Sequence, residues 1–242
     1  MADESQHVIR SFDQELKRLR DMMTEMGGLV ERELALSMAA VLERDGTAAT
    51  QAVETDPEVD ALERAVEQFV IRMLALRQPV AIDLRQVVMA LKITHDLERI
   101  GDYAANIAKR SIVLAEFALP LSLGGLAHMG RLVQEALKAV IDSVGENDAE
   151  KAVQVWNADL AVDDLYTTIF RELITYMMED PRNITPCTHL LFVAKNLERI
   201  GDHATNIAET IYYAVNGETL PTMRPKADTS PYAAIRPKEQ AQ

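Results

Sequence analysis

The chain has 242 residues, of which 48% are hydrophobic and only 5% aromatic, a balance that favours packed helices over a strand-and-turn architecture. Its net charge of −13 would repel a phosphate backbone, which argues against direct binding of nucleic acid. A single cysteine, Cys187, excludes an intramolecular disulfide and a cysteine-based metal cage, and agrees with a reducing compartment.

Nothing in the chain indicates export or membrane insertion. The N-terminal sequence Met-Ala-Asp-Glu-Ser-Gln-His lacks the charged-then-apolar layout of a secretory signal. No uninterrupted apolar run approaches the ~18 residues that a membrane helix needs. We therefore expect a cytoplasmic protein without membrane insertion.

Three amphipathic stripes predict three helices in the first half. Apolar residues alternate spacings of four and three over residues 12–34, and again over residues 59–76, where the run ends before Pro79. Proline lacks the backbone donor that a helix needs. A third stripe covers residues 93–114 and ends before a Pro/Gly segment at 119–125, which is the best candidate for a domain boundary.

The second half repeats this plan, with helices predicted over residues 132–144, 149–178 and about 188–215, the first of them shorter than its counterpart. After Gly217, four prolines and few large apolar residues predict a disordered tail. We expect an all-α fold of two tandem, pseudosymmetric three-helix bundles. Their predicted bounds are residues 1–118 and 119–216, followed by the Pro-rich tail at 217–242.

An internal repeat supports this duplication. The sequence Leu-Glu-Arg-Ile-Gly-Asp at 97–102 returns at 197–202, and both copies continue as Ala-x-Asn-Ile-Ala. A weaker echo, Asp-x-x-Val-Asp, begins at Asp56 and again at Asp159. A period near 100 residues is too long for a solenoid and implies two similar domains.

The repeated acids indicate a chemistry. Glu98 and Asp102 are four residues apart, so they share one helix face, nearly opposite the apolar stripe, and we do not expect them in the core. In an antiparallel hairpin that turns at Pro79, residues equidistant from the turn lie side by side, which places Asp56 and Asp60 level with this pair. A turn between Asp180 and Pro181 does the same in the second half. The predicted metal ligands are Asp56, Asp60, Glu98 and Asp102, and Asp159, Asp163, Glu198 and Asp202.

Four carboxylates at one height suit hard cations such as Mg²⁺, Ca²⁺, Mn²⁺ or iron. Two simpler interpretations stay open: the acids form a solvated helix face, or Arg99 and Arg199 neutralise them in surface salt bridges worth roughly 0–1 kcal/mol. His95, His203, Asn106 and Asn206 are weaker candidate ligands near the acidic faces. Glycines at 101 and 201, inside helices, predict close approach of another helix or group.

The blocks at residues 96–108 and 196–209 resemble the PhoU family, the phosphate-transport accessory and regulatory proteins of bacteria. The resemblance implies two three-helix bundles, with metal held on each by Glu/Asp-x-x-x-Asp motifs that match the eight acids above. It leaves the metal open among iron, manganese, magnesium and zinc. The two copies differ at Asp96 and Asn196, and at Tyr103 and His203.

The resemblance also implies a role. Such proteins are regulatory adaptors rather than enzymes: they dampen phosphate uptake and repress the phosphate-starvation response when phosphate is plentiful. The implied partners are a phosphate-sensing histidine kinase, the ATPase of the phosphate-specific ABC transporter, and a second copy in a homodimer. The alternative is a metal-storage or structural helical-bundle protein without a signalling role. The sequence contains no phosphate-cradling glycine loop or kinase signature.

Overall fold

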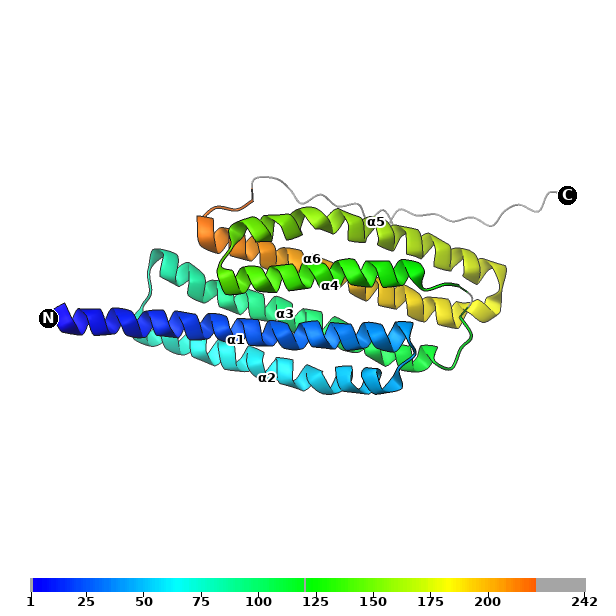
Figure 1. The fold of residues 1–242 in the computed structure, drawn as a ribbon, viewed down its shortest axis with the longest axis horizontal. Helices are drawn as coiled ribbons and strands as arrows, with labels where there is room; N and C mark the ends of the chain where they lie inside the picture. Colours follow the sequence, from blue (N-terminus) through cyan, green and yellow to red (C-terminus); the bar gives the residue numbers. More distant parts are fainter. Residues whose placement is uncertain (1, 120, 221–242) are drawn as a thin grey trace.

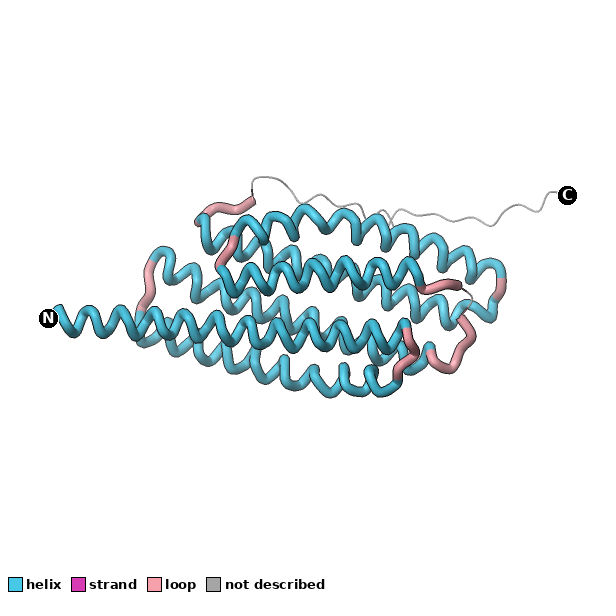
Figure 2. Tube along the Cα trace, viewed as in Figure 1, coloured by secondary structure: helices cyan, strands magenta, loops and turns pink. Residues whose placement is uncertain are grey.

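The computed structural model of the chain describes residues 2–119 and 121–220. Six α-helices account for most of this part: α1 (Ala2–Leu42), α2 (Gly46–Arg77), α3 (Ala81–Leu114), α4 (Gly124–Glu146), α5 (Ala149–Glu179) and α6 (Ile184–Asn216). A short 3₁₀ turn, η1 (Pro181–Asn183), precedes α6. No strand occurs among the described residues, and only short loops connect the helices (Figure 2), so the prediction of an all-α fold is confirmed.

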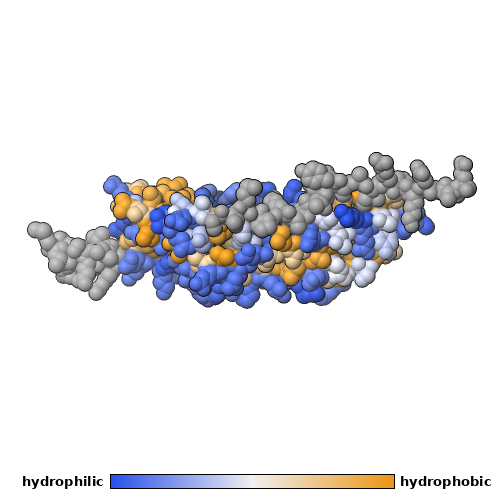
Figure 3. Space-filling view, turned by 90° about the horizontal axis from the view of Figure 1, so that it is seen from above, coloured by the Kyte–Doolittle hydropathy of each residue, from blue (hydrophilic) through white to orange (hydrophobic). Residues whose placement is uncertain are grey.

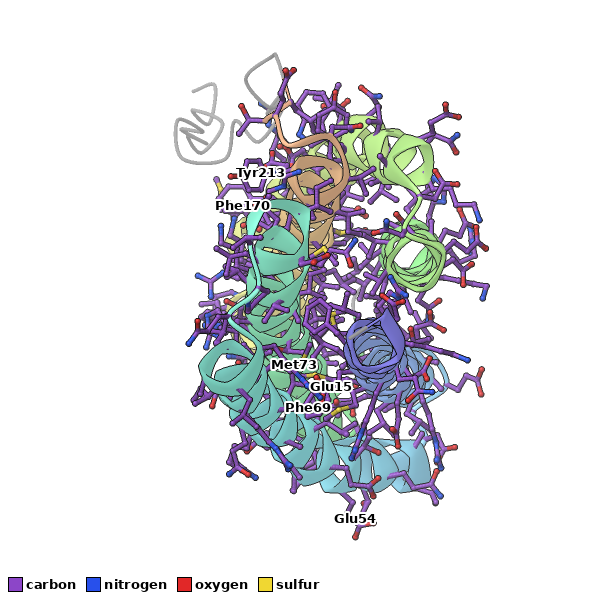
Figure 4. The ribbon with its side chains drawn as sticks, turned by 90° about the vertical axis from the view of Figure 1, so that its left-hand side faces the viewer. Glu15, Glu54, Phe69, Met73, Phe170 and Tyr213 are labelled. Atoms are coloured by element: carbon purple, nitrogen blue, oxygen red, sulfur yellow. The ribbon has the colours of Figure 1, made fainter. Side chains whose placement is uncertain are left out.

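The helices lie along one long axis in two groups of three, α1–α3 and α4–α6, and the chain reverses direction at each end (Figure 1). Helix α3 packs against α6, and α1 against α4. The buried apolar side chains of both groups form one continuous core. Figure 4, which looks along the helices, shows Phe69 and Met73 of α2 pointing inward and Glu54 of the same helix pointing away from the bundle. The predicted bundle limits at 118 and 119 stay a prediction.

Matching caps begin the second helix of each group. The Asp45 side chain accepts hydrogen bonds from the amides of Thr47 and Ala48 at the start of α2. Asp148 does the same for the first amides of α5. Each cap satisfies donors that a helix N-terminus leaves unpaired, and is worth ~1 kcal/mol. The caps are separated by the same number of residues as Asp56 and Asp159, so the internal repeat includes the start of this helix.

Both hairpins turn where the sequence predicted. Helix α2 ends at Arg77, where Gln78 adopts a left-handed backbone with φ of 49°, and Pro79 follows. Helix α5 ends one residue before Asp180, whose carboxylate accepts a hydrogen bond from the Arg182 amide in η1. The two turns therefore fix which residues of α2 and α3, and of α5 and α6, lie at equal height.

Helices α1, α2, α3 and α4 begin 10, 13, 12 and 8 residues before their predicted apolar stripes at residues 12, 59, 93 and 132. Helix α1 begins at Ala2, ten residues before the predicted start, and spans 41 residues, whereas α4 spans 23, so the prediction of a shorter fourth helix is confirmed. Helix α6 ends at Asn216, and the next residue, Gly217, caps it with a φ of 77° that suits glycine. The predicted disorder of the tail concerns mainly residues 221–242, which lie outside the described residues. Among the helices described, none is both long and apolar enough to cross a bilayer.

Candidate metal centres

The first candidate site lies between α2 and α3. Burial raises the pKa of Asp56, and the neighbouring charges of Asp102 and Asp60 raise it further. The Oδ1 of Asp56 lies 3.9 Å from the position that a Cβ on Gly101 would occupy. The charges of Asp60 and Asp102 therefore act on Asp56, but among the described residues the ligand atoms of these three acids do not form a group within 4.8 Å of one another.

Glu98 belongs to an adjoining part of the same face. Burial raises its pKa, and the charges of Asp102 and Glu63 raise it further. Glu63, His95 and Glu98 each offer a ligand atom, and these three atoms lie within 4.8 Å of one another, a spacing that could hold a metal ion. Glu63 was missed, although the midpoint between Glu63 and His95 also falls at Pro79, so the same hairpin reasoning would have found it.

Arginines neutralise part of this surface. Arg99 Nη1 lies 3.2 Å from Asp102 Oδ2, and Arg64 Nη1 lies 3.5 Å from Asp60 Oδ2. The four side chains are 40–61% exposed, and such pairs typically contribute 0–1 kcal/mol. Salt bridges of the kind expected from the sequence therefore form at the solvent-exposed edge of the first site. Arg199 lies over the Tyr103 ring, with its Cζ 5.5 Å from the ring centroid.

The second candidate site is more deeply buried than the first. Asp159, Asp163 and Glu198 are 6%, 3% and 6% exposed, and Asp202 is half-buried. Glu98 and Asp102, which were expected outside the core, are half-buried, whereas Glu198, the counterpart of Glu98, is buried. The reason is that α6 packs against α3, α4 and α5 at once, so most of its circumference is covered.

Glu198 is held by one cation and surrounded by acids. Lys195 Nζ donates a hydrogen bond of 2.8 Å to Glu198 Oε1, while Oε2 is buried without a hydrogen-bond partner. Burial raises the pKa of Glu198, the Lys195 hydrogen bond lowers it, and the charges of Asp202 and Asp163 raise it. A buried carboxylate oxygen without a donor favours a bound proton or a cation.

The two repeated glycines, at 101 and 201, lie close to acidic side chains of the two candidate sites. A Cβ on Gly201 would lie 3.5 Å from Asp159 Oδ1, and a Cβ on Gly101 would lie 3.2 Å from Glu33 Oε2. The predicted close approach is therefore confirmed at both. Thr205 Oγ1 also donates to Asp159 Oδ1 at 3.4 Å, a contact that the first half, with alanine at 105, does not repeat.

Three weaker candidates are explained without metal. Asn106 and Asn206 are exposed. His203 Nδ1 lies 2.7 Å from Asp96 Oδ1, so this histidine bridges α6 and α3 between the two groups of helices.

Glu33 on α1 is a second acid that sequence reasoning missed. It is 0% exposed, and neither carboxylate oxygen has a hydrogen-bond partner. Burial, followed by the charges of Asp56 and Asp102, raises the pKa of Glu33 to about 9. The sequence does indicate that Glu33 faces inward, because it lies three residues after Val30 and one before Leu34, and both belong to the apolar stripe.

These features define a class of protein: an all-α protein with an internal duplication, in which each half carries carboxylates where its second and third helices meet. The PhoU domain model matches residues 23–111 and 126–211, once in each half. The chain belongs to the PhoU family.

Relatives match over nearly their whole length. The chain is 50% identical over 226 residues to the "phosphate-specific transport system accessory protein PhoU homolog" of Caulobacter vibrioides, covering 93% of this chain and 98% of the relative. It is 48% identical over 223 residues to that of Rhizobium meliloti, covering 92% and 94%. The crystal structure of PhoU from Pseudomonas aeruginosa superposes with a TM-score of 0.83 at 40% identity, covering 86% of this chain and 100% of that one.

Proposed function

We propose that this chain is a regulatory adaptor, not an enzyme, that modulates phosphate uptake by the phosphate-specific ABC transporter and represses the phosphate-starvation two-component response when phosphate is plentiful. The observation that carries this proposal is the 50% identity to a phosphate-specific transport system accessory protein across 98% of that protein. Similarity over the full length supports the same overall role more strongly than similarity over one domain would.

The proposed partners are those of the family resemblance: a phosphate-sensing histidine kinase, the ATPase of the transporter, and a second copy of the chain. An exposed apolar patch is available for contact with protein. It lies where α3 begins and includes Val80, Ile82, Leu84 and Val88, which are 39–73% exposed. Apolar side chains gather toward this end of the molecule in Figure 3. Contiguous exposed apolar surface is a common mark of protein–protein contact.

We further propose that the eight predicted acids bind metal, with iron, manganese, magnesium or zinc as the candidate ions. The buried, unpartnered Oε2 of Glu198 and the raised pKa of Asp56 and Glu98 support this, because a cation would relieve both burial and repulsion. Bound metal would supply electrostatic cross-links, joining α2 to α3 and α5 to α6. Metal storage or a purely structural bundle is the competing function.

Deleting the gene tests the regulatory role. Because the adaptor is proposed to repress the starvation response, the deletion strain should express phosphatase at a high level in phosphate-rich medium, and a plasmid copy should restore repression. Phosphatase activity measured in rich and limiting phosphate reports both states. Normal repression in the deletion strain would contradict the regulatory role and leave storage or a structural role.

A further inference from the structure

Glu33 borders the first site although it is on a helix that the Glu/Asp-x-x-x-Asp motifs do not include. Its Oε2 lies 3.2 Å from the Cβ position of Gly101, and Asp56 Oδ1 lies 3.9 Å from the same point, so the two carboxylates approach the same glycine. The charged groups that act on Glu33 are Asp56, Asp60 and Asp102 and, with the opposite sign, Lys109. The side chain is therefore directed into the acidic site from α1.

A buried carboxylate with both oxygens unpartnered is costly to a fold, so it needs a reason to be retained. Mutual packing does not supply that reason, since an apolar side chain would fill the same space without the desolvation cost. Carboxylate oxygens from different helices that converge on one point are what a hard cation requires. The Glu33 carboxylate is therefore better explained as a metal ligand than as a residue that only packs.

The second half lacks this group. Buried residues of α1 and α4 correspond at the spacing that relates Asp56 to Asp159, as shown by the pairs Met26 and Met129, Val30 and Val133, and Leu34 and Leu137. At this spacing the counterpart of Glu33 is Ala136. Ala136 lines an open pocket of about 220 Å³ together with Glu135, Asp159, Gly201 and Thr205. The second half therefore has alanine where the first half has a buried acid, and the preceding acid of α4, Glu135, is exposed.

We propose that Glu33 is a fifth carboxylate ligand of the first metal site, and that this site binds a hard divalent cation more tightly than the second. The proposal rests on the proposed metal binding. Through Glu33 the first site joins all three helices α1, α2 and α3, whereas the second joins α5 and α6. Binding displaces a proton from the Glu33 carboxyl to solvent, because the ligand form is the carboxylate.

Mn²⁺ titration of the chelator-treated, full-length protein tests this. In the wild type, equilibrium dialysis should resolve a tighter and a weaker class of site. Glu33→Gln preserves shape and removes one anionic ligand, and is expected to weaken the tighter class about 10- to 100-fold, as loss of a supporting group at a metal site commonly does. The affinity of the weaker class should not change. The melting temperature of the metal-free protein should not fall, because a neutral amide replaces a buried acid.

Two further variants make the test specific. Glu31→Gln is the matched control: it lies on the same helix, but its charged neighbours are Lys138 and Asp142 on α4, and binding should not change. Ala136→Glu directs a carboxylate into the pocket of the second half and should strengthen the weaker class.

The outcomes separate the two proposals. Wild-type binding with no change in Glu33→Gln or in Ala136→Glu would overturn the role of Glu33 and leave the proposed metal binding intact. Failure of the wild type to bind Mn²⁺ specifically would overturn both.

Discussion

Replacing Asp56, Asp102, Asp159 and Asp202 together by asparagine is expected to abolish specific metal binding. The substitution removes one anionic oxygen ligand from each of α2, α3, α5 and α6, while asparagine keeps the shape of each side chain. Asparagine also retains a carbonyl oxygen that can accept the Thr205 hydrogen bond now made to Asp159. Elemental analysis after dialysis against Mn²⁺ should therefore show metal in the wild type and none above background in the variant.

The matched control neutralises as many acids elsewhere on α2 and α5. Glu54, Glu58, Asp164 and Glu172 are exposed on the same two helices, and Figure 4 shows Glu54 directed away from the bundle. Changing these four to glutamine or asparagine makes the net charge less negative by the same amount and should leave metal binding intact. Retention of wild-type metal content by the Asp56, Asp102, Asp159 and Asp202 variant would show that the predicted ligands are wrong.

The metal-free protein is expected to lose stability as pH rises from about 5 to 8. The Glu33 carboxyl keeps its proton in the folded state up to a pKa of about 9, whereas in the unfolded chain it releases that proton near its ordinary pKa of 4.5. Between these values the unfolded state binds fewer protons, so the free energy of unfolding falls as pH rises, by at most about 1.4 kcal/mol per pH unit for one proton.

Other groups modify this slope in known directions. The pKa values of Asp56, Glu98 and Glu198 are also raised, so they act in the same sense as Glu33. The hydrogen bond from Arg77 lowers the pKa of Glu15, whose stabilising contribution is lost only as pH falls below its ordinary range, outside this window. Burial lowers the pKa of His189, which acts in the opposite sense below its ordinary pKa of 6.5. Glu33 and three further acids act against this one histidine, so the wild-type slope should be negative overall between pH 5 and 8.

Urea unfolding of chelator-treated protein at several pH values measures the slope, and Glu33→Gln should flatten it because glutamine does not titrate. Saturating Mn²⁺ should oppose the decline, since metal binds the deprotonated carboxylates that become available at higher pH. A free energy of unfolding that is constant or rises over this range, in both proteins, would contradict the burial of a protonated Glu33.

Geometry along the helix axis could be predicted from the sequence because it depends on local rules. The positions of Pro79 and Pro181 set the turns, and a regular rise per residue then determines which acids share a height. The same reasoning extends to Glu63 and His95. Burial around the axis could not be predicted in this way, because it depends on which distant helices cover each face. Glu198 is an example, since it is buried while its counterpart Glu98 is half-buried.

The differences between the two copies have a structural meaning that sequence comparison alone could not supply. Asp96 and His203 occupy positions at which the copies do not match, and the structure pairs them with each other across the α3–α6 contact, at 2.7 Å. The Tyr103 and His203 rings also meet, with centroids 5.7 Å apart. Because α3 and α6 are corresponding helices that pack against each other, residues at their contact can differ between the two copies. Complementary groups, rather than identical ones, stabilise such a contact.

Anomalous diffraction from a crystal grown in Mn²⁺, recorded at the manganese edge, tests the metal assignment most directly. The expected map has anomalous peaks between α2 and α3 beside Asp56, Glu98 and Asp102, with the Glu33 carboxylate among the ligands, and between α5 and α6 beside Glu198 and Asp202. A map at saturating Mn²⁺ with no peak at either group of acids would contradict it.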